Sequence, residues 1–203
     1  MPSDHYFSEK PAARGRRQII EADLRGFTIK LITEAGVFSR ERVDRGTRLL
    51  INHVAVQPAD SVLDLGCGYG VVGVVAALLA PEGRVTLVDI NHRAVALARR
   101  NLTLNTIANA EVLQGDGFAP VAGRAFDLIA FNPPIRAGSH VVHRLIEEAS
   151  HHLAAGGRLY LVGRTKQGVI RISEKMSEVF GAADEIAKGG GYRLYLSRRT
   201  DSE

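Results

Sequence analysis

The chain is poor in the features that mark secreted and membrane proteins. Its 203 residues include no tryptophan and a single cysteine, Cys67. Because a disulfide needs two cysteines, an internal disulfide is excluded. No apolar run reaches the length of about 18 residues that a transmembrane helix requires. The first residues, Met-Pro-Ser-Asp-His-Tyr, also lack the apolar core of a signal peptide. We therefore expect a cytoplasmic protein with no membrane partner.

The composition is that of one globular domain with a modest positive charge. Hydrophobic residues make up 45% of the chain and charged residues 24%, which suits a substantial core. The net charge is +4, and arginines are concentrated in the first quarter, at positions 14, 16, 17, 25, 40, 42, 45 and 48. Guanidinium groups bind phosphates well, so this region is a candidate RNA contact. A solvated helical face is the alternative, because acidic residues are interspersed among the arginines.

The order of the expected elements indicates an α/β fold. From residue 61 onward, strands (61–65, 84–90, 110–114, 126–131, 157–164) alternate with helices (70–80, 92–104, 139–154, 168–180). Such alternation predicts a doubly wound, mostly parallel sheet with helices on both faces. Residues 183–188 and 192–198 flank three glycines and predict an antiparallel C-terminal hairpin, which completes a seven-stranded sheet. We assign residues 1–57, with a strand at 27–33 and a helix at 47–56, to an N-terminal extension on the substrate side. Residues 58–203 form the catalytic domain that binds the ligand.

A stiff polar tetrapeptide, Asn132-Pro133-Pro134-Ile135, follows the apolar strand 126–131. Two consecutive prolines fix φ twice and remove two backbone donors, which stiffens the chain where the strand ends. The Asn132 side chain and the Pro133 carbonyl can then act as two fixed acceptors for a planar NH2 group on a base or an amide. A rigid loop with an incidental asparagine is the alternative for the tetrapeptide taken alone.

A glycine-rich turn, Asp-Leu-Gly-Cys-Gly-Tyr-Gly at residues 64–70, joins the first strand of the alternating region to an apolar helix. Glycines allow positive φ and a close approach of the backbone to a ligand, and the helix N-terminus adds free N–H groups. The spacing differs from the dinucleotide pattern, and the Asp64 carboxylate would repel a phosphate but attract an ammonium group. A ligand with an amino acid moiety therefore fits better than NAD. The candidate ligand contacts in the turn are Gly66, Cys67, Gly68 and Gly70, with Cys67 as a small packing residue.

Two further acids follow the next two strands. Asp89 ends the strand 84–90, where its carboxylate can accept both hydroxyls of a ribose; capping the following helix is the alternative. Asp116 follows the strand 110–114 and can accept from an adenine amino group. In that case Gly117 lies beside it, and Phe118 or Ile90 packs against the ring. A plain turn residue between two glycines is the alternative for Asp116.

These four sites occur in a fixed order, each at an expected strand end, and the chain thereby resembles class I S-adenosylmethionine-dependent methyltransferases over most of its length. Two segments, 36–39 and 43–50, resemble the entry segment of the RsmC-type ribosomal RNA guanine-N2 methyltransferases. His5-Tyr6-Phe7-Ser8-Glu9 and the segments 132–138, 165–168 and 190–193 resemble a compact, single-domain branch of that group. The larger RsmC-type enzymes have an additional N-terminal domain, and their tetrapeptide ends in Phe where this chain has Ile135.

The resemblance implies an S-adenosylmethionine-dependent N-methyltransferase acting on an exocyclic amino group, guanine N2 of small-subunit ribosomal RNA, either free or in the 30S subunit. It implies a catalytic tetrapeptide of Asn132, Pro133, Pro134 and Ile135, and a monomer or homodimer. A base flipped out of its helix needs a stacking surface. The candidate substrate contacts are Tyr6, Phe7, Phe38, Arg136 and Lys166, although Phe38 can equally be a core residue and Lys166 can equally begin a helix. No metal is expected, because His140 and His143 have no suitable third ligand nearby in sequence.

Three alternatives stay open. Adenine-N6 methyltransferases and release-factor glutamine methyltransferases also carry Asn-Pro-Pro-x, usually with an aromatic fourth residue. A non-catalytic RNA-binding or ribosome-assembly protein with the same fold is an alternative of another class, against which the intact Asp64, Asp89 and Asn132 argue. A small-molecule methyltransferase is the third, and the stiff tetrapeptide argues against it.

Overall fold

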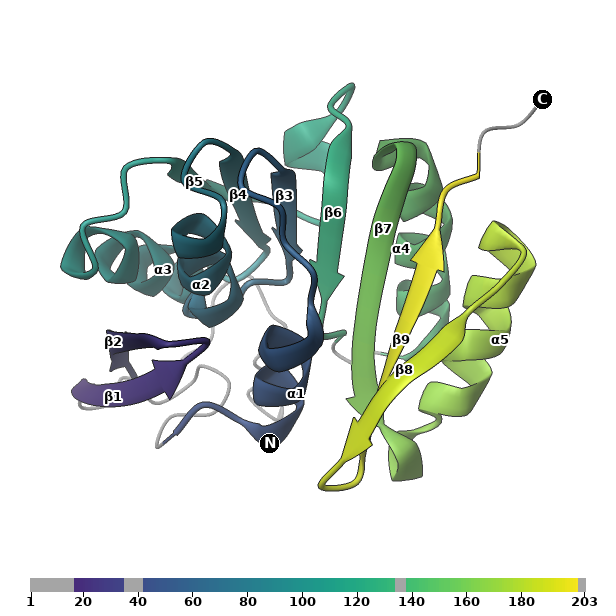
Figure 1. Ribbon diagram of the computed structural model, residues 1–203, viewed down its shortest axis with the longest axis horizontal. Helices are drawn as coiled ribbons and strands as arrows, with labels where there is room; N and C mark the ends of the chain where they lie inside the picture. The colour runs from purple at the N-terminus through teal and green to yellow at the C-terminus, as the bar shows by residue number, and fades with distance from the viewer. Residues whose placement is uncertain (1–16, 35–41, 134–137, 201–203) are drawn as a thin grey trace, which may run out of the picture.

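A seven-stranded sheet with a mostly parallel arrangement forms the centre of the protein (Figure 1). The computed structural model describes residues 17–34, 42–133 and 138–200. The strand order is β5-β4-β3-β6-β7-β9-β8, and the strands are β3 (Ser61–Leu65), β4 (Arg84–Asp89), β5 (Ala110–Gln114), β6 (Phe126–Phe131), β7 (Leu153–Arg164), β8 (Asp184–Gly189) and β9 (Tyr192–Arg198). Only β9 runs antiparallel to its neighbours β7 and β8 among the described strands of this sheet. The predicted fold class, with its C-terminal antiparallel hairpin, is confirmed.

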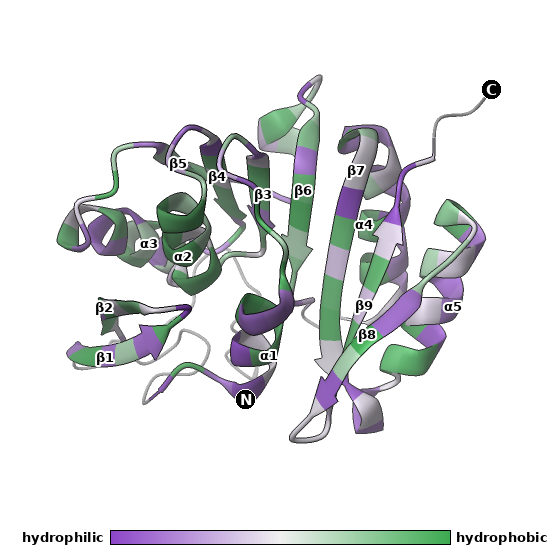
Figure 2. Ribbon diagram, in the orientation of Figure 1, coloured by the Kyte–Doolittle hydropathy of each residue, from purple (hydrophilic) through white to green (hydrophobic). Residues whose placement is uncertain are grey.

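Helices cover both faces of the sheet (Figure 1). They are α1 (Arg45–His53), α2 (Val71–Leu79), α3 (His92–Leu104), α4 (Ser139–His152) and α5 (Val169–Phe180). Side chains alternate between the faces along each strand. On β6, Leu128 and Ala130 join the core under α1, α2 and α3, whereas Ile129 and Phe131 join the core under α4 and α5. Both faces are therefore buried, and the central strands are hydrophobic along most of their length (Figure 2). No helix in the described part of the chain is long and apolar enough to cross a membrane.

The N-terminal part forms a separate two-stranded sheet, in which β1 (Gln18–Leu24) pairs antiparallel with β2 (Phe27–Thr33). The strand β2 was predicted, whereas β1 was not recognised, because the exposed Ile19 interrupts the alternation of apolar and polar residues along it. The two-residue turn has positive φ at Arg25 (53°) and Gly26 (86°), which matches the twist of a tight hairpin. The Arg25 guanidinium donates to the carbonyls of Ile51 (3.1 Å) and Val54 (2.9 Å). It thereby satisfies carbonyls at the C-terminus of α1, which ends at His53 rather than at residue 56.

Two asparagines of α3 attach this hairpin to the main domain. Asn101 accepts from the Ile32 N–H (2.7 Å) and donates to the carbonyls of Ile32 (3.0 Å) and Tyr69 (2.8 Å). Asn105, one turn further on, pairs in the same way with the N–H (3.1 Å) and carbonyl (2.8 Å) of Lys30. The side-chain amides thus satisfy the edge of β2 as a neighbouring strand would. Asn101 is fully buried and also holds the glycine-rich turn at Tyr69.

Several other boundaries differ from the prediction by one to four residues, and the starts of α1 and β7 have a clear cause. Helix α1 begins at Arg45 rather than at residue 47, because Asp44 caps it. Strand β7 begins at Leu153 rather than at residue 157, and Leu153 already pairs with Phe126 of β6. A register shift follows at once in this pairing, so the glycine-containing segment 154–157 reads as a loop in sequence although it belongs to the strand. The division of the chain at residue 57 stays a prediction; α1, from the proposed extension, packs directly on β7, β8 and β9.

Candidate active site

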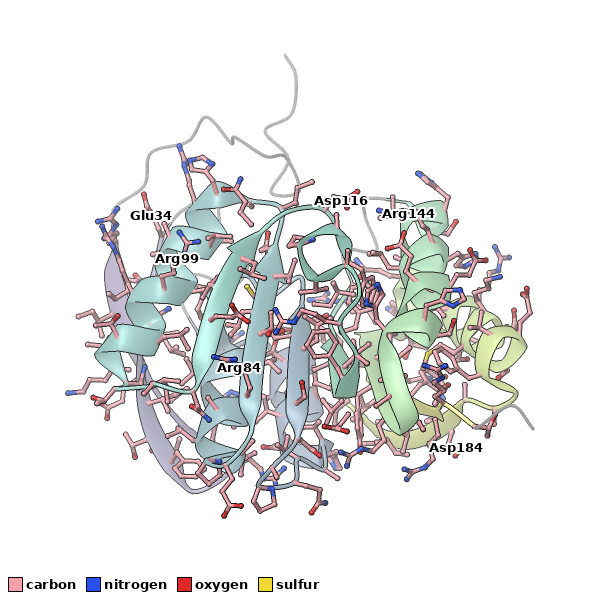
Figure 3. The ribbon with its side chains drawn as sticks, turned by 90° about the horizontal axis from the view of Figure 1, so that it is seen from above. Glu34, Arg84, Arg99, Asp116, Arg144 and Asp184 are labelled. Atoms are coloured by element: carbon pink, nitrogen blue, oxygen red, sulfur yellow. The ribbon has the colours of Figure 1, made fainter. Side chains whose placement is uncertain are left out.

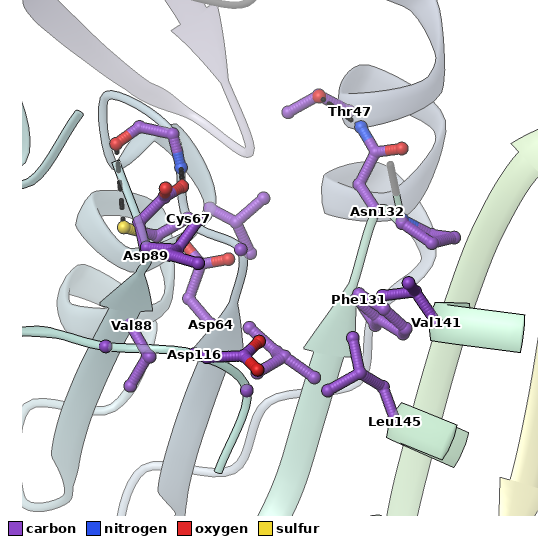
Figure 4. Close-up of a pocket in the computed structure, with 18 of the residues that line it drawn as sticks. Thr47, Asp64, Cys67, Val88, Asp89, Asp116, Phe131, Asn132, Val141 and Leu145 are labelled. Carbon is purple, nitrogen blue, oxygen red and sulfur yellow. Dashed lines mark hydrogen bonds between the residues drawn. The ribbon is translucent and has the colours of Figure 1, made fainter. Parts of the chain in front are cut away.

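A cavity of about 320 Å³ opens at the carboxyl ends of β3, β4, β5 and β6 (Figure 4). This is where ligands bind in open α/β sheets. Its lining comes from five parts of the chain. They are Thr47 of α1; residues 64–69, 71 and 72 from β3, the glycine-rich turn and α2; residues 88–90 at the end of β4; residues 115–117 after β5; and Phe131, Asn132, Pro133, Val141, Arg144 and Leu145 from β6 to α4. The cavity therefore brings together Asp64, Asp89, Asp116 and Asn132, the four polar side chains expected at strand ends.

The glycine-rich turn is held against β4 by its own backbone. The N–H groups of Gly66 (2.8 Å) and Cys67 (3.0 Å) both donate to the Val88 carbonyl. Gly66 and Gly68 have positive φ, 69° and 58°, which favours glycine at both positions. The backbone of this turn thus reaches the cavity with no side chain in front of Gly66.

The two remaining candidates in the turn, Gly70 and Cys67, pack against neighbouring parts of the protein. Gly70 (φ 87°) does not line the cavity, and a Cβ there would lie 3.1 Å from both Leu87 Cδ2 and Ala98 Cβ. Its smallness therefore serves the packing of the turn against α3 and β4. The Cys67 thiol is buried and lies 3.5 Å from the Gly68 carbonyl. Burial raises the pKa of the Cys67 thiol, as do the nearby carboxylates Asp89 and Asp64, which disfavours the thiolate that a nucleophile requires.

Asp64 is a buried carboxylate at the tip of β3. Its Oδ2 atom accepts from the Gly73 N–H at 2.9 Å, in the first turn of α2. Burial raises the pKa of Asp64 to about 7, the Gly73 N–H opposes this shift, and the charge of Asp89 adds to it. A cationic group placed in the cavity would favour the ionised form, so Asp64 is a suitable partner for an ammonium group.

Asp89 is fixed by two backbone donors at the tip of β4. Its Oδ2 accepts from the Gly68 N–H and its Oδ1 from the Asn91 N–H, both at 2.8 Å. Burial raises its pKa, and these two N–H groups oppose the shift. Helix α3 is capped by Asn91, whose Oδ1 accepts from the Arg93 N–H at 2.9 Å, so the capping role considered for Asp89 is excluded. Each Asp89 oxygen keeps acceptor capacity, a geometry that suits two neighbouring hydroxyls.

Asp116 is paired with an arginine that the sequence did not single out. Arg144, in the second turn of α4, donates through Nη2 to both oxygens of Asp116, at 3.1 and 3.0 Å, and through Nη1 to Glu148 at 2.8 Å. The two residues project from different elements at the same end of the sheet (Figure 3). Of the two ring contacts considered, Ile90 is partly exposed and lines the cavity. Phe118 is buried, stacks on His152 with centroids 4.6 Å apart, and is absent from the lining.

Asn132 lies across the cavity from Asp89, at the tip of β6 (Figure 4). Its Nδ2 donates to the Thr47 hydroxyl at 3.2 Å, and the Thr47 hydroxyl donates to Asp44. Pro133 is buried and lines the cavity. Thr47 was not predicted as a site residue, because its partner Asn132 is 85 positions away and no local pattern links them.

None of the other predicted site residues that could contact the substrate is seen at the cavity in the described part of the chain. Tyr6, Phe7, Phe38, Pro134, Ile135 and Arg136 lie outside the described part of the chain. Lys166 is exposed in a short 3-10 helix (Thr165–Gln167) and does not line the cavity. Gly117, a predicted cofactor contact, has a φ of 54° and does line the cavity. Among residues 17–34, 42–133 and 138–200, no group of three or more His, Cys, Asp or Glu side chains is placed to hold a metal ion.

The fold and the site define a class I S-adenosylmethionine-dependent methyltransferase. A model of the methyltransferase small domain matches residues 28–196. The uncharacterized protein YbxB of Bacillus subtilis is 37% identical over 97% of this chain and 99% of its own length. The ribosomal RNA small subunit methyltransferase C of Pseudomonas fluorescens is 38% identical over 84% of this chain but only 51% of its own length.

The solved structures agree on the fold. The Thermus thermophilus 16S rRNA N2 G1207 methyltransferase RsmC, in complex with AdoMet and guanosine, superposes with a TM-score of 0.81 at 24% identity. The superposition covers 94% of this chain and 52% of RsmC, so the chain spans about half the length of the RsmC proteins that it matches. The chain belongs to the methyltransferase small domain family and is an RsmC-like, S-adenosylmethionine-dependent methyltransferase.

Proposed function

We propose that this protein methylates an exocyclic amino group, guanine N2 of small-subunit ribosomal RNA. The observation that carries the proposal is the side chain of Asn132, held at the cavity with its amide nitrogen already used by Thr47. An amide whose nitrogen is engaged has its oxygen left as an acceptor. An acceptor beside two stiff prolines suits a nucleophile that brings N–H bonds.

The remaining lining suits S-adenosylmethionine group by group. Asp64 provides a carboxylate for the ammonium group, and Asp89 provides two oxygens for the ribose hydroxyls. Ile90 provides an apolar surface for the adenine ring, and Asp116 provides an acceptor for its amino group. When bound, this cofactor supplies a methyl group that its sulfonium has already activated.

The protein's own contribution is position and electrostatics. Holding two reactants in line can supply roughly 7–11 kcal/mol of a barrier. The Asn132 oxygen and the Pro133 carbonyl accept hydrogen bonds from the two N–H groups of the amine. These bonds draw the amine nitrogen toward tetrahedral geometry. They also stabilise the positive charge that develops on that nitrogen. The proton then leaves to water, so neither a general base nor a metal is required.

Several basic residues near the cavity suit an RNA substrate. Arg45 and Arg48 flank Thr47 on α1, and Arg164 ends β7 beside Tyr192. A guanine in a helix must be flipped out before its amino group reaches Asn132. We assign the stacking surface to Tyr6, Phe7 or Phe38 and further contacts to Arg136 and Lys166. A ribosomal substrate also implies a cytoplasmic location.

Methyl transfer from labelled S-adenosylmethionine to undermodified ribosomal RNA and to 30S subunits tests this proposal. The product is digested to nucleosides and identified by mass, with Asn132→Ala as the comparison. N2-methylguanosine that falls by about 100-fold or more in the variant is the expected result. Detection of N6-methyladenosine instead would mean that the substrate is adenine and not guanine. Label only in protein, or none at all despite cofactor binding, would contradict an RNA methyltransferase.

A further inference from the structure

The side-chain amide of an asparagine has an accepting end and a donating end, and only the accepting end suits an incoming amine. We propose that Thr47 and Asp44 are positioning residues that fix which end of the Asn132 amide faces the substrate. The inference rests on the proposed function for the nature of the substrate group. The orientation itself follows from hydrogen bonds within the protein.

The direction of each hydrogen bond is set by Asp44. An ionised aspartate can only accept, and Asp44 accepts from the N–H groups of Gly46 (2.8 Å) and Thr47 (3.2 Å) and from the Thr47 hydroxyl. The hydroxyl has one proton, which this bond uses, so its lone pairs face the next partner. That partner is Nδ2 of Asn132, at 3.2 Å. In the reversed amide, two oxygens would face each other with no proton between them. The Nδ2 atom is therefore the end bound to Thr47, and the oxygen of Asn132 is the end left to accept from a substrate.

The chain of hydrogen bonds is anchored on rigid elements. Asp44 is the N-cap of α1, and Thr47 lies in the first turn of that helix with 8% of its surface exposed. At Gly46 the helix approaches β9 so closely that a Cβ would lie 2.5 Å from Tyr192 Cε1. The Tyr192 hydroxyl in turn accepts from Arg164 Nε at 2.7 Å, at the end of β7. A positioning group on a packed helix holds its target more exactly than one on a loop.

The reactive consequence concerns polarity. With the oxygen toward the cavity, Asn132 accepts a hydrogen bond from an N–H group of the amine and stabilises the positive charge that develops on its nitrogen. With the nitrogen toward the cavity, it would point N–H bonds at the same nucleophile and repel its N–H groups. Losing the Thr47 hydroxyl removes the preference between the two orientations, so the step slows although the cofactor still binds.

The matched pair Thr47→Val and Thr47→Ser tests this role by single-turnover methyl transfer to undermodified ribosomal RNA at saturating cofactor. Valine keeps the branched shape but lacks the hydroxyl, and serine keeps the hydroxyl. We expect Thr47→Val to slow the step about 10-fold to 100-fold, with Thr47→Ser within about 3-fold of the unmodified protein. Cofactor affinity, measured by calorimetry, should change by less than about 2-fold. Thr103→Val is the control, because Thr103 is exposed on α3 and its hydroxyl donates to the Arg99 carbonyl, away from the cavity lining.

A double-mutant cycle separates positioning from packing. If Thr47 acts through Asn132, Thr47→Val adds nothing to the loss already caused by Asn132→Ala, because residues in one network are not additive. Additive losses, or a Thr47→Val protein as fast as the unmodified one, would overturn the positioning role.

A spectroscopic measurement tests the same contact without any substrate. The 15N–1H signals of the Asn132 side-chain amide are identified by their absence in Asn132→Ala. We expect Thr47→Val to shift these signals and to speed their exchange with water, and Thr47→Ser to leave both unchanged. Unchanged signals in Thr47→Val overturn the inference. If no RNA is methylated by the unmodified protein while the amide signals respond as expected, the proposed function fails and the positioning contact stands.

Discussion

The two halves of the active site are built in different ways. On the cofactor half, Asp89 is held by N–H groups 2 and 21 positions away, and Asp64 by one 9 positions away. All three donors are backbone groups within one strand-helix-strand unit. On the transfer half, Asn132 is held by a side chain 85 positions away, from a helix that precedes the whole unit. Asp64 and Asp89 are thus held by backbone groups near them in sequence, whereas the Asn132 contact exists only after α1 has packed on the sheet.

This comparison predicts where the two halves depend on each other. The fully buried Asn101 connects the N-terminal hairpin to the glycine-rich turn through three hydrogen bonds, two to Ile32 and one to Tyr69. Asn101→Ala leaves the Ile32 N–H and the Ile32 and Tyr69 carbonyls without this partner, and we expect a loss of about 4 kcal/mol in the free energy of unfolding. Denaturant titration measures it. Asn105→Ala is the matched control, because its bonds to Lys30 are exposed, and it should cost only about 1 kcal/mol. Equal losses in both variants would contradict the special role of Asn101.

Removing the Asp89 carboxylate should weaken cofactor binding rather than slow the transfer step. Asp89→Ala deletes both acceptors for the ribose hydroxyls, and we expect cofactor affinity to fall about 100-fold. Calorimetric titration with S-adenosylmethionine measures this change. Asp184→Ala, at an exposed position of β8, provides the comparison and should bind the cofactor normally. An Asp89→Ala protein with unchanged affinity would remove Asp89 from the cofactor site.

The pKa of Asp64 makes cofactor binding depend on pH. Below pH 7 the buried carboxyl is mostly protonated, so an ammonium group gains a charged partner only as the pH rises. We expect affinity to increase about 10-fold between pH 5.5 and 7.5, and Asp64→Asn to abolish this dependence. A titration of the unmodified protein that is flat over this range would contradict the pairing.

The same carboxyl has the opposite effect on the protein without cofactor. Because the folded-state pKa of Asp64, about 7, lies above the ordinary aspartate pKa of 3.8, the folded chain keeps a proton that the unfolded chain has lost. The contribution of Asp64 to stability is therefore greatest below about pH 4, decreases as the pH rises toward 7, and is constant above that. Thermal unfolding of the unmodified protein and of Asp64→Asn over this range measures the difference.

The features that could be predicted from sequence are those encoded by residues close together in the chain. Strand-end acids and glycines stand in short, ordered patterns, so the sheet, the hairpin and Asp64, Asp89 and Asp116 were placed from sequence. Long-range side-chain contacts leave no such pattern. Thr47, Arg144 and Asn101 acquire their partners only through the packing of α1, α4 and α3. The exposed Ile19 interrupts the alternating pattern of β1, so that strand was missed. Phe118 shows the converse: its position beside Asp116 suggested a ligand contact, whereas its ring packs on His152.

The most direct test measures cofactor affinity and single-turnover methyl transfer side by side for Asp89→Ala and Thr47→Val. A site built from two separable halves predicts a crossed pattern. Asp89→Ala should bind the cofactor about 100-fold more weakly yet approach the normal rate at saturation, and Thr47→Val should bind normally yet transfer about 10-fold or more slowly. Parallel losses of both quantities in both variants would contradict the division of the site.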